Sequence, residues 1–186
     1  MKLFLLIIIF IFSTQNLIKA DDIRDFQIER MSIGDSLLDY FSIAEINKAV
    51  DESSEDRIYI VKSFAKKKFK TYEAVQVAYK ENNNKMILTS IAGVISFSNK
   101  IEKCKKKMYQ IDKNLTDLFP SADRKDWGKY DNPDSSGHYF PITFTFDDAS
   151  MAMVSCHDWI ESTRIDDNLK VSLFEAKYSL YVKNQN

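Results

Sequence analysis

One apolar stripe, between residues 99 and 119, constrains the fold of this chain more than any other feature. Its apolar residues recur at spacings of three and four, which is the pattern of one face of an amphipathic α-helix. They are Ile101, Cys104, Met108, Ile111, Leu115, Leu118 and Phe119. The charged residues that we expect on the water side are Lys103, Lys105, Lys106, Lys107, Asp112, Lys113 and Asp117. Ser98 is placed to cap the first turn, and Pro120 cannot continue the helix. Such a helix needs a flat apolar partner, so the sequence predicts that it packs on a sheet.

The segment 150–160 is the best candidate for a strand beneath this helix. Neighbouring side chains of a strand point to opposite faces. One side of this segment carries Ala152, Val154, Cys156 and Ile160, and the other carries Met151, Met153 and Trp159. Small residues at positions 152 and 154 allow a helix to approach closely. This arrangement predicts that Cys156 lies under Cys104.

The first twenty residues have the layout of a secretory signal peptide. A basic start, Met1-Lys2, precedes an apolar run over residues 3–12, and a polar stretch then leads to Ala20. The run is short for a membrane span, which needs about 20 residues. We therefore expect residues 1–20 to be cleaved, leaving residues 21–186 as a single exported domain with no stable membrane span. An uncleaved membrane anchor is the alternative.

Export bears on the two cysteines, because disulfides persist in oxidising compartments. We expect a bridge between Cys104 and Cys156. Closing the long loop between them would stabilise the fold by about 4 kcal/mol in the chain-entropy model. Two buried free thiols are the alternative.

The rest of the chain predicts an α+β domain with a largely antiparallel sheet. Strand signals cover residues 58–64, 73–80, 86–97, 139–146 and 169–174 besides the segment already described. Residues 81–84 form a hairpin loop, and a bend or bulge is expected at Gly93. Residues 121–138 are predicted to be irregular, and residues 175–182 are either a short helix or an extension of the last strand. With 186 residues, 45% hydrophobic, the chain has the size and composition of one soluble domain. We expect the long helix, about 99–119, and short N-terminal helices on one side of the sheet.

The N-terminal part of the mature chain carries the signals of those short helices. Two sequences, Ser32–Asp35 and Ser42–Glu45, have the pattern of a capping box. Before them, Phe26 and Ile28 alternate with polar residues, as in a short edge strand.

No pattern in the sequence assigns a catalytic residue, a cofactor or a metal ligand. Cys156 and His157 are adjacent, but neighbours on a strand point to opposite faces, and a thiol enzyme would have to use His138 instead. Four aspartates crowd the stretch 121–138 without the spacing of a calcium loop: Asp123, Asp126, Asp131 and Asp134. The formal net charge is −1, and removal of the basic signal segment would make the chain more acidic, which argues against a nucleic-acid partner.

Three functional hypotheses remain. The first is an exported, periplasmic or secreted, non-catalytic domain that binds a protein or an envelope component. The second is an enzyme with an unrecognised site near Cys156 and His157. The third is a small-ligand binder that uses exposed aromatic residues. The candidate contacts for a ligand or partner are Trp127, Tyr130, His138, His157 and Trp159. The oligomeric state is left open.

Two stretches resemble known groups of proteins. Residues 31–41, MSIGDSLLDYF, and residues 154–159, VSCHDW, are similar to small exported proteins of low-GC marine bacteria. The resemblance implies export, covers most of the mature chain including both cysteines, and brings no activity with it. The early stretch is also loosely similar to the BamE/SmpA outer-membrane lipoproteins, which are small α+β scaffolds. Arg30 stands where that family has a glycine, and the lipidated cysteine is missing.

Overall fold

A single antiparallel sheet forms the centre of the protein. The computed structural model describes residues 22–65, 69–132 and 135–185. Within these ranges the nine strands are β1 (Val50–Asp51), β2 (Tyr59–Ala65), β3 (Ala74–Lys80), β4 (Leu88–Ser96), β5 (Asp123–Asp126), β6 (Tyr130–Asp131), β7 (Gly137–Thr145), β8 (Met151–Trp159) and β9 (Asn168–Phe174). Their order is β1-β2-β3-β4-β9-β8-β7-β5, and β6 pairs with β7. The predicted α+β class with a large antiparallel sheet is confirmed.

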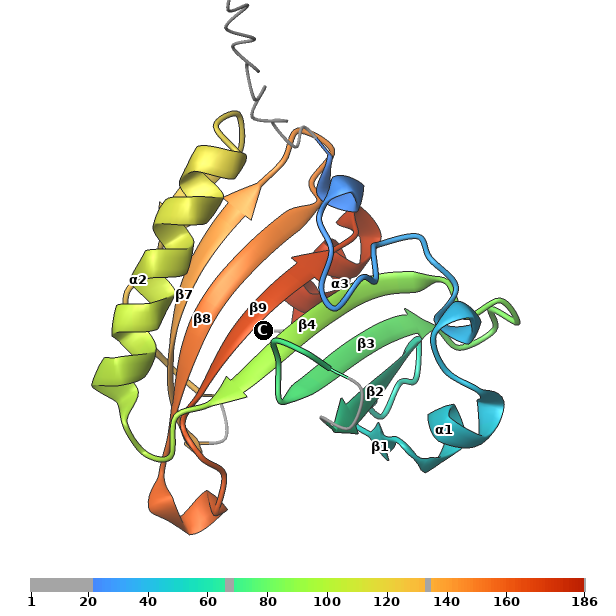
Figure 1. The fold of residues 1–186 in the computed structure, drawn as a ribbon, viewed down its shortest axis with the longest axis horizontal. Helices are drawn as coiled ribbons and strands as arrows, with labels where there is room; N and C mark the ends of the chain where they lie inside the picture. The colour runs from blue at the N-terminus through green and yellow to red at the C-terminus, as the bar shows by residue number, and fades with distance from the viewer. Residues whose placement is uncertain (1–21, 66–68, 133–134, 186) are drawn as a thin grey trace, which may run out of the picture.

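The helices lie on both faces of the sheet, so the expectation of helices on one side alone was wrong. Helix α2 (Ile101–Leu118) lies over β8 and β9, and α3 (Ala176–Gln185) packs behind the sheet on the opposite face (Figure 1). The short helix α1 (Ile43–Lys48) and the 3-10 turns η1 (Ile23–Asp25) and η2 (Leu37–Asp39) belong to an N-terminal segment that packs into the same core as α2. A third turn, η3 (Glu161–Thr163), connects β8 to β9. We call the face under α2 the covered face and the other the α3 face.

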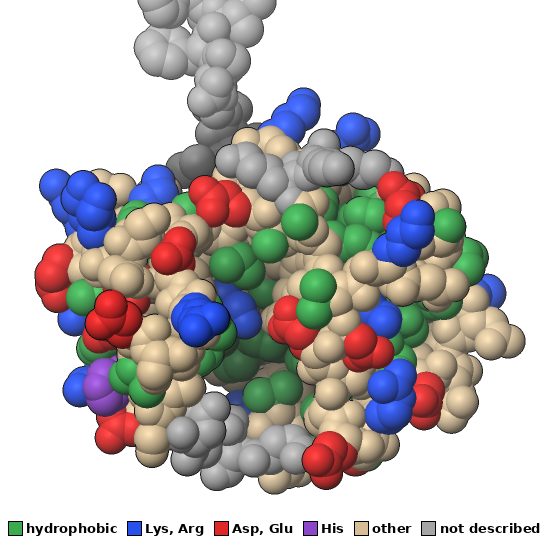
Figure 2. Space-filling view, turned by 90° about the horizontal axis from the view of Figure 1, so that it is seen from below, with side chains coloured by type: hydrophobic (Ala, Val, Ile, Leu, Met, Phe, Trp, Pro, Cys, Tyr) green, Lys and Arg blue, Asp and Glu red, His purple; other side chains and the backbone are tan. Residues whose placement is uncertain are grey.

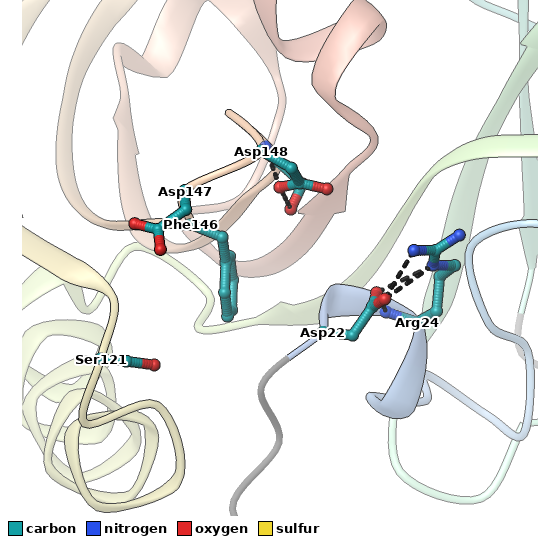
Figure 3. Close-up of a pocket in the computed structure, with 7 residues that line it drawn as sticks. Asp22, Arg24, Ser121, Phe146, Asp147 and Asp148 are labelled. Atoms are coloured by element: carbon teal, nitrogen blue, oxygen red, sulfur yellow. Dashed lines mark hydrogen bonds and ion pairs between the residues drawn. The ribbon is translucent and has the colours of Figure 1, made fainter.

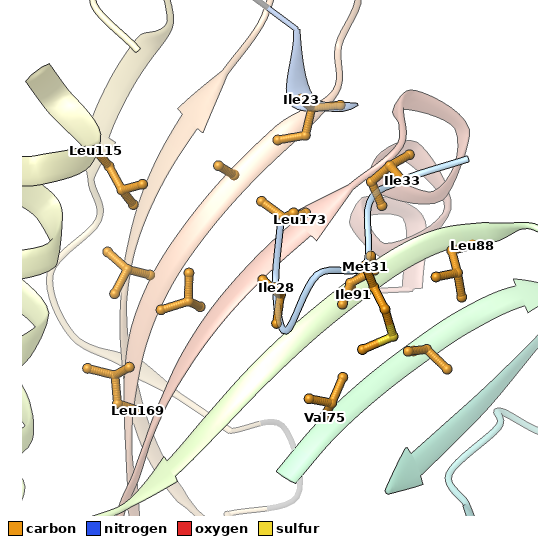
Figure 4. Close-up of a cluster of buried hydrophobic side chains, with 14 of the residues drawn as sticks. Ile23, Ile28, Met31, Ile33, Val75, Leu88, Ile91, Leu115, Leu169 and Leu173 are labelled. Atoms are coloured by element: carbon orange, nitrogen blue, oxygen red, sulfur yellow. The ribbon is translucent and has the colours of Figure 1, made fainter. Parts of the chain in front are cut away.

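The main core lies on the covered face, between the sheet, α2 and the N-terminal segment. Figure 4 shows Ile28 and Met31 of the N-terminal segment close to Ile91 of β4 and Leu173 of β9, with Leu115 of α2 at one side. All five of these side chains are at most 3% exposed. The N-terminal segment therefore completes the core that α2 covers only in part. From below, hydrophobic side chains line a central hollow, and charges of both signs are interspersed around it (Figure 2).

The predicted pairing of the two cysteines is confirmed. Cys104 of α2 and Cys156 of β8 form a disulfide with a Cα–Cα distance of 5.9 Å, and neither residue is exposed. The same face of β8 carries Ala152 and Val154, both buried beneath the helix. A disulfide is compatible with an oxidising, exported location.

One predicted surface residue of α2 is in fact buried. Asp112 is only 9% exposed. Arg124 of β5 donates two hydrogen bonds to the Asp112 carboxylate, from Nε to Oδ1 at 2.7 Å and from Nη2 to Oδ2 at 2.8 Å. A bidentate arginine–carboxylate pair of this kind is specific in geometry as well as in charge. It ties the long helix to the edge of the sheet.

The stretch 121–138 is not irregular, as it contains β5 and β6. Strand β5 consists of four charged residues, all exposed, and therefore lacks the apolar alternation that marks a strand in sequence. It exists because it pairs with β7, from Asp123 opposite Thr145 to Asp126 opposite Ile142. Charged residues on an edge strand also discourage pairing with a second sheet.

Several local predictions differ from the structure in detail. The capping box of Ser42 and Glu45 is confirmed, but Ser98 has a positive φ and does not cap α2. Phe26 and Ile28 do not form the expected edge strand, since Ile28 makes only an isolated bridge with Met31 and the preceding residues 23–25 form a 3-10 turn. Ser32 does not cap a helix. The N-cap of the turn η2 is Ser36 instead.

The expected bulge does not lie at Gly93, which pairs in regular register with Val75 of β3 and Val171 of β9. The irregularity in the β3–β4 ladder lies between Ala78 and Tyr79, opposite Leu88. A Cβ atom at position 93 would lie 2.5 Å from the ring of Tyr72, so glycine leaves room for that ring. The predicted signal peptide, residues 1–20, falls outside the described residues. No helix in the described part of the chain has both the length and the apolar character needed to cross a membrane.

Reduction of the disulfide should lower the free energy of unfolding by about 4 kcal/mol, because the bond closes a long loop, with a sequence separation of 52. Urea unfolding with and without reductant measures this loss. The double variant Cys104→Ala/Cys156→Ala is the matched control, since it has no bond to reduce. Its urea midpoint should lie near that of the reduced wild type and should not change when reductant is added. Equal midpoints for oxidised and reduced wild type would contradict the role assigned to the bridge.

Candidate functional site

The α3 face carries a run of aromatic, sulfur-containing and hydroxyl side chains. The covered face buries Ile142, Val154 and Leu173. Because side chains alternate along a strand, the residues on either side of these three point to the α3 face. These neighbours include Tyr139, Pro141, Thr143 and Thr145 of β7, Met151, Met153, Ser155, His157 and Trp159 of β8, and Lys170, Ser172 and Phe174 of β9. Helix α3 covers only part of this surface.

An open cleft of about 260 Å³ lies between α3 and the strands β7 and β8. It is lined by Trp127, Tyr130, Tyr139, Pro141, Thr143, Thr145, Met151, Met153, Phe174, Ser179, Val182 and Lys183. Most of these side chains are apolar or aromatic, with a few polar groups among them. Small-molecule sites in proteins usually have this make-up. We call it the aromatic cleft.

The aromatic wall of the cleft is held in place by specific contacts. The indole N–H of Trp127 donates a hydrogen bond to Thr143 Oγ1 at 3.0 Å, and the backbone N–H of Trp127 donates to the carbonyl of Pro141 at 3.1 Å. The Lys125 ammonium lies 3.4 Å from the centre of the Trp127 ring. Tyr130 follows, with its ring centre 6.2 Å from that of Trp127. Both residues are nonetheless 41% exposed, so they are available to a ligand.

The opposite wall is helix α3, which is fixed to the sheet by its own aromatic cluster. Tyr178 packs edge-on against Tyr59 of β2, with ring centres 4.9 Å apart, and stacks on Phe174. Burial, together with the neighbouring tyrosines, raises the pKa of Tyr178 to about 12. The Tyr181 hydroxyl donates to the Asp56 carboxylate at 2.8 Å. These contacts hold the helix in the position at which Ser179, Val182 and Lys183 line the cleft.

Ser179 has a property that sets it apart from the other residues of the lining. Its side chain is fully buried, and its hydroxyl has no hydrogen-bond partner within the part of the chain that the structure describes. The other two such atoms there, Trp159 Nε1 and Asn168 Oδ1, do not line the cleft. A buried polar group without a partner costs roughly 1–3 kcal/mol. A ligand able to accept a hydrogen bond would offset that cost.

The aromatic row continues beyond the cleft along β7 and β8. The Tyr130 and Tyr139 ring centres lie 5.7 Å apart, as do those of Tyr139 and His157. Trp159 stacks on the other side of His157 at 5.8 Å. Burial, and to a lesser degree the charge of Lys170, lowers the pKa of His157 to about 3. His157 is therefore a neutral, stacked ring at neutral pH.

The His157 region does not form a nucleophilic centre. Ser155 Oγ lies 3.1 Å from His157 Nε2, but a ring whose pKa is lowered to about 3 is too weak a base to activate the serine. No carboxylate bonds to the His157 ring among the described residues, so the ring lacks the third group that orients a general base. Cys156 is on the opposite face and is held in the disulfide. The chemistry suggested by the Cys156–His157 neighbours is therefore not available in this state.

A second pocket lies where the described chain begins, between η1 and the β7–β8 turn (Figure 3). Its polar groups are largely paired with one another. Asp22 accepts hydrogen bonds from the Arg24 side chain, and Asp148 accepts from the backbone N–H of Ser150 at 2.9 Å. Within the described ranges no three His, Cys, Asp or Glu side chains are grouped so that they could hold a metal ion. This pocket consequently supplies no functional argument.

The five residues predicted as ligand or partner contacts divide between the two faces. Trp127 and Tyr130 line the aromatic cleft, and His157 and Trp159 continue the aromatic row. His138 points to the covered face, where its Nδ1 lies 2.7 Å from Asp131 Oδ1.

Sequence reasoning missed ten of the twelve residues that line the cleft, among them Tyr139, Met153, Ser179 and Lys183. The first two could have been found, because the alternation in 139–146 and 150–160 places them opposite the core residues. The last two could not, because their place depends on which face α3 covers.

A scan against protein-family models, a search of curated proteins and a search of solved structures each find no match to this chain. The resemblances seen in the sequence remain predictions. Function is therefore inferred from the geometry of the chain itself.

The pKa of His157 leads to a pH dependence of stability. An unfolded histidine takes up a proton near pH 6.5, but folded His157 does so only near pH 3. Between these values the unfolded state binds the extra proton, so the free energy of unfolding falls as the pH falls. Between about pH 7 and pH 4.5, the free energy of unfolding should fall by roughly 2 kcal/mol more in wild type than in His157→Gln. Urea unfolding over this range measures the difference. Parallel pH profiles for the two proteins would contradict the lowered pKa of the ring.

Proposed function

We propose that this protein is an exported, non-catalytic binding domain that holds a small apolar molecule in the aromatic cleft. The observation that carries the proposal is the cleft itself: an open cavity of about 260 Å³, walled by Trp127, Tyr130 and Tyr139. Export is supported by the signal-like sequence of residues 1–20, and a disulfide is compatible with it.

The construction of the cleft favours binding over a merely structural role. Two of its aromatic rings, Trp127 and Tyr130, are 41% exposed although they are held by neighbouring contacts. Ordered and exposed aromatic side chains bind well, because little conformational freedom is lost when a ligand arrives. The cavity already exists without a ligand, as is usual for small-molecule sites.

A protein or envelope component is the second candidate for the occupant. Trp127 and Tyr130 lie at the exposed side of the cleft, so a larger partner could insert one apolar group between them. The two candidates share the same lining. They differ in whether a free small molecule is sufficient for binding.

Saturable binding of a neutral apolar dye with two fused rings, such as Prodan, tests the proposal. Tyr139→Ala removes part of the aromatic wall and should weaken dye binding about tenfold, the equivalent of losing one good aromatic contact. Tyr109→Ala is the matched control, because Tyr109 is a tyrosine on α2 that is 52% exposed and lies outside the cleft. It should bind the dye as wild type does. Circular dichroism confirms that both variants fold.

Two results would contradict the proposal. One is the absence of saturable dye binding to folded wild type. The other is an equal loss in both tyrosine variants, since the binding surface would then lie elsewhere.

A further inference from the structure

We propose that the ligand of the aromatic cleft is a small amphipathic anion, with a compact apolar body and a carboxylate or similar acceptor group at one end. This inference rests on the proposed function and names the ligand class for the same site. Three observations carry it: the sign of the charges at the cleft, the unpaired hydroxyl of Ser179 and the size of the cavity.

The charged side chains at the cleft are lysines. Lys183 lines it from α3, and Lys125 lies over the outer wall, against the Trp127 ring. No acidic side chain is part of the lining. Asp123 lies opposite Thr145 at the end of β7, and Asp126 and Asp131 adjoin Trp127 and Tyr130 in the sequence, but none of the three lines the cavity. In a chain with a formal net charge of −1, a cleft with only cationic side chains favours an anionic ligand.

The polar groups of α3 lie on one side of the cleft. Ser179 and Lys183 are four residues apart on the helix, so they share one helix face. Ser179 offers a hydroxyl proton that has no acceptor in the described part of the chain, and Lys183 offers an ammonium group. A carboxylate can accept from both at once, because it has two oxygens with free lone pairs. Hydrogen bonds to a charged acceptor are also the stronger ones.

The apolar body of the ligand would lie on the other side. There the lining consists of the rings of Tyr130 and Tyr139 with Met153 and Pro141. A volume of about 260 Å³ is slightly below the usual range for ligand pockets, roughly 300–1,000 Å³. This size fits one or two fused rings or a short alkyl chain. Methionine side chains adapt to different apolar shapes, so the cleft need not be restricted to one body.

Three probes with the same apolar body separate charge from shape: naphthalene-1-carboxylate, 1-naphthylmethanol and 1-naphthylmethylammonium. Isothermal titration should show the carboxylate binding about tenfold more tightly than the alcohol, and the ammonium most weakly. Added salt should weaken binding of the carboxylate and leave the alcohol unchanged, because salt screens exposed charges.

Two variants test whether side chains of α3 cause the preference for the carboxylate. Lys183→Gln should weaken carboxylate binding about fivefold without changing alcohol binding. Ser179→Ala should weaken carboxylate binding about tenfold without lowering the melting temperature, since the hydroxyl has no partner to lose. Lys177→Gln is the matched control, because Lys177 is an exposed lysine of the same helix that does not line the cleft.

The outcomes distinguish this inference from the proposed function. If the carboxylate and the alcohol bind equally, or the ammonium binds best, the anionic class is wrong while an apolar binding site remains. An equal effect of Lys177→Gln and Lys183→Gln would also overturn it, because the charge would then act only at long range. If neither the three probes nor Prodan bind to folded protein, the proposed function fails as well.

Discussion

The link between α2 and β8 is the constraint on which the rest of this structure depends. The disulfide between Cys104 and Cys156 fixes which side of β8 lies beneath the long helix. Side chains alternate along a strand, so this single choice also decides that Met153 and His157 lie on the α3 face. A shift of one residue would bury those side chains and expose Val154. The core and the candidate site are therefore set by the same register.

The two faces of the sheet are covered to different degrees, and the cleft follows from that difference. The covered face receives an 18-residue helix and the N-terminal segment, which together bury a continuous core. The α3 face receives a 10-residue helix that packs mainly on Tyr59 and Phe174. The strands β7 and β8 extend beyond the reach of that helix. Aromatic rings, which tolerate both apolar contact and water, occupy the surface left at this boundary.

The structural features that follow from a short-range repeat of apolar residues could be predicted from the sequence. The spacing of apolar residues predicts α2 within two residues of each end, and alternation predicts the inward side of β7 and β8. The two cysteines could be paired because Cys104 falls on the apolar stripe of α2 and Cys156 on the inward side of β8. Each of these predictions uses a pattern that is complete within one segment of the chain.

The features that depend on distant partners were not predictable. Strand β5 has no apolar pattern and exists because β7 offers it an edge. The burial of Asp112 likewise requires Arg124 from that strand. The cleft inherits the same dependence, since Trp127 takes its place from the chain between β5 and β6. The side of the sheet that α3 occupies, and with it the role of Ser179, also appears only in three dimensions.

Amide NMR of isotope-labelled protein, titrated with naphthalene-1-carboxylate, tests the central claim most directly. We expect chemical-shift changes to concentrate on β7 near Tyr139, on β8 near Met153 and on α3 near Ser179, and to saturate together. Changes centred on α2 or the N-terminal segment, or none at all, would contradict a binding site on the α3 face.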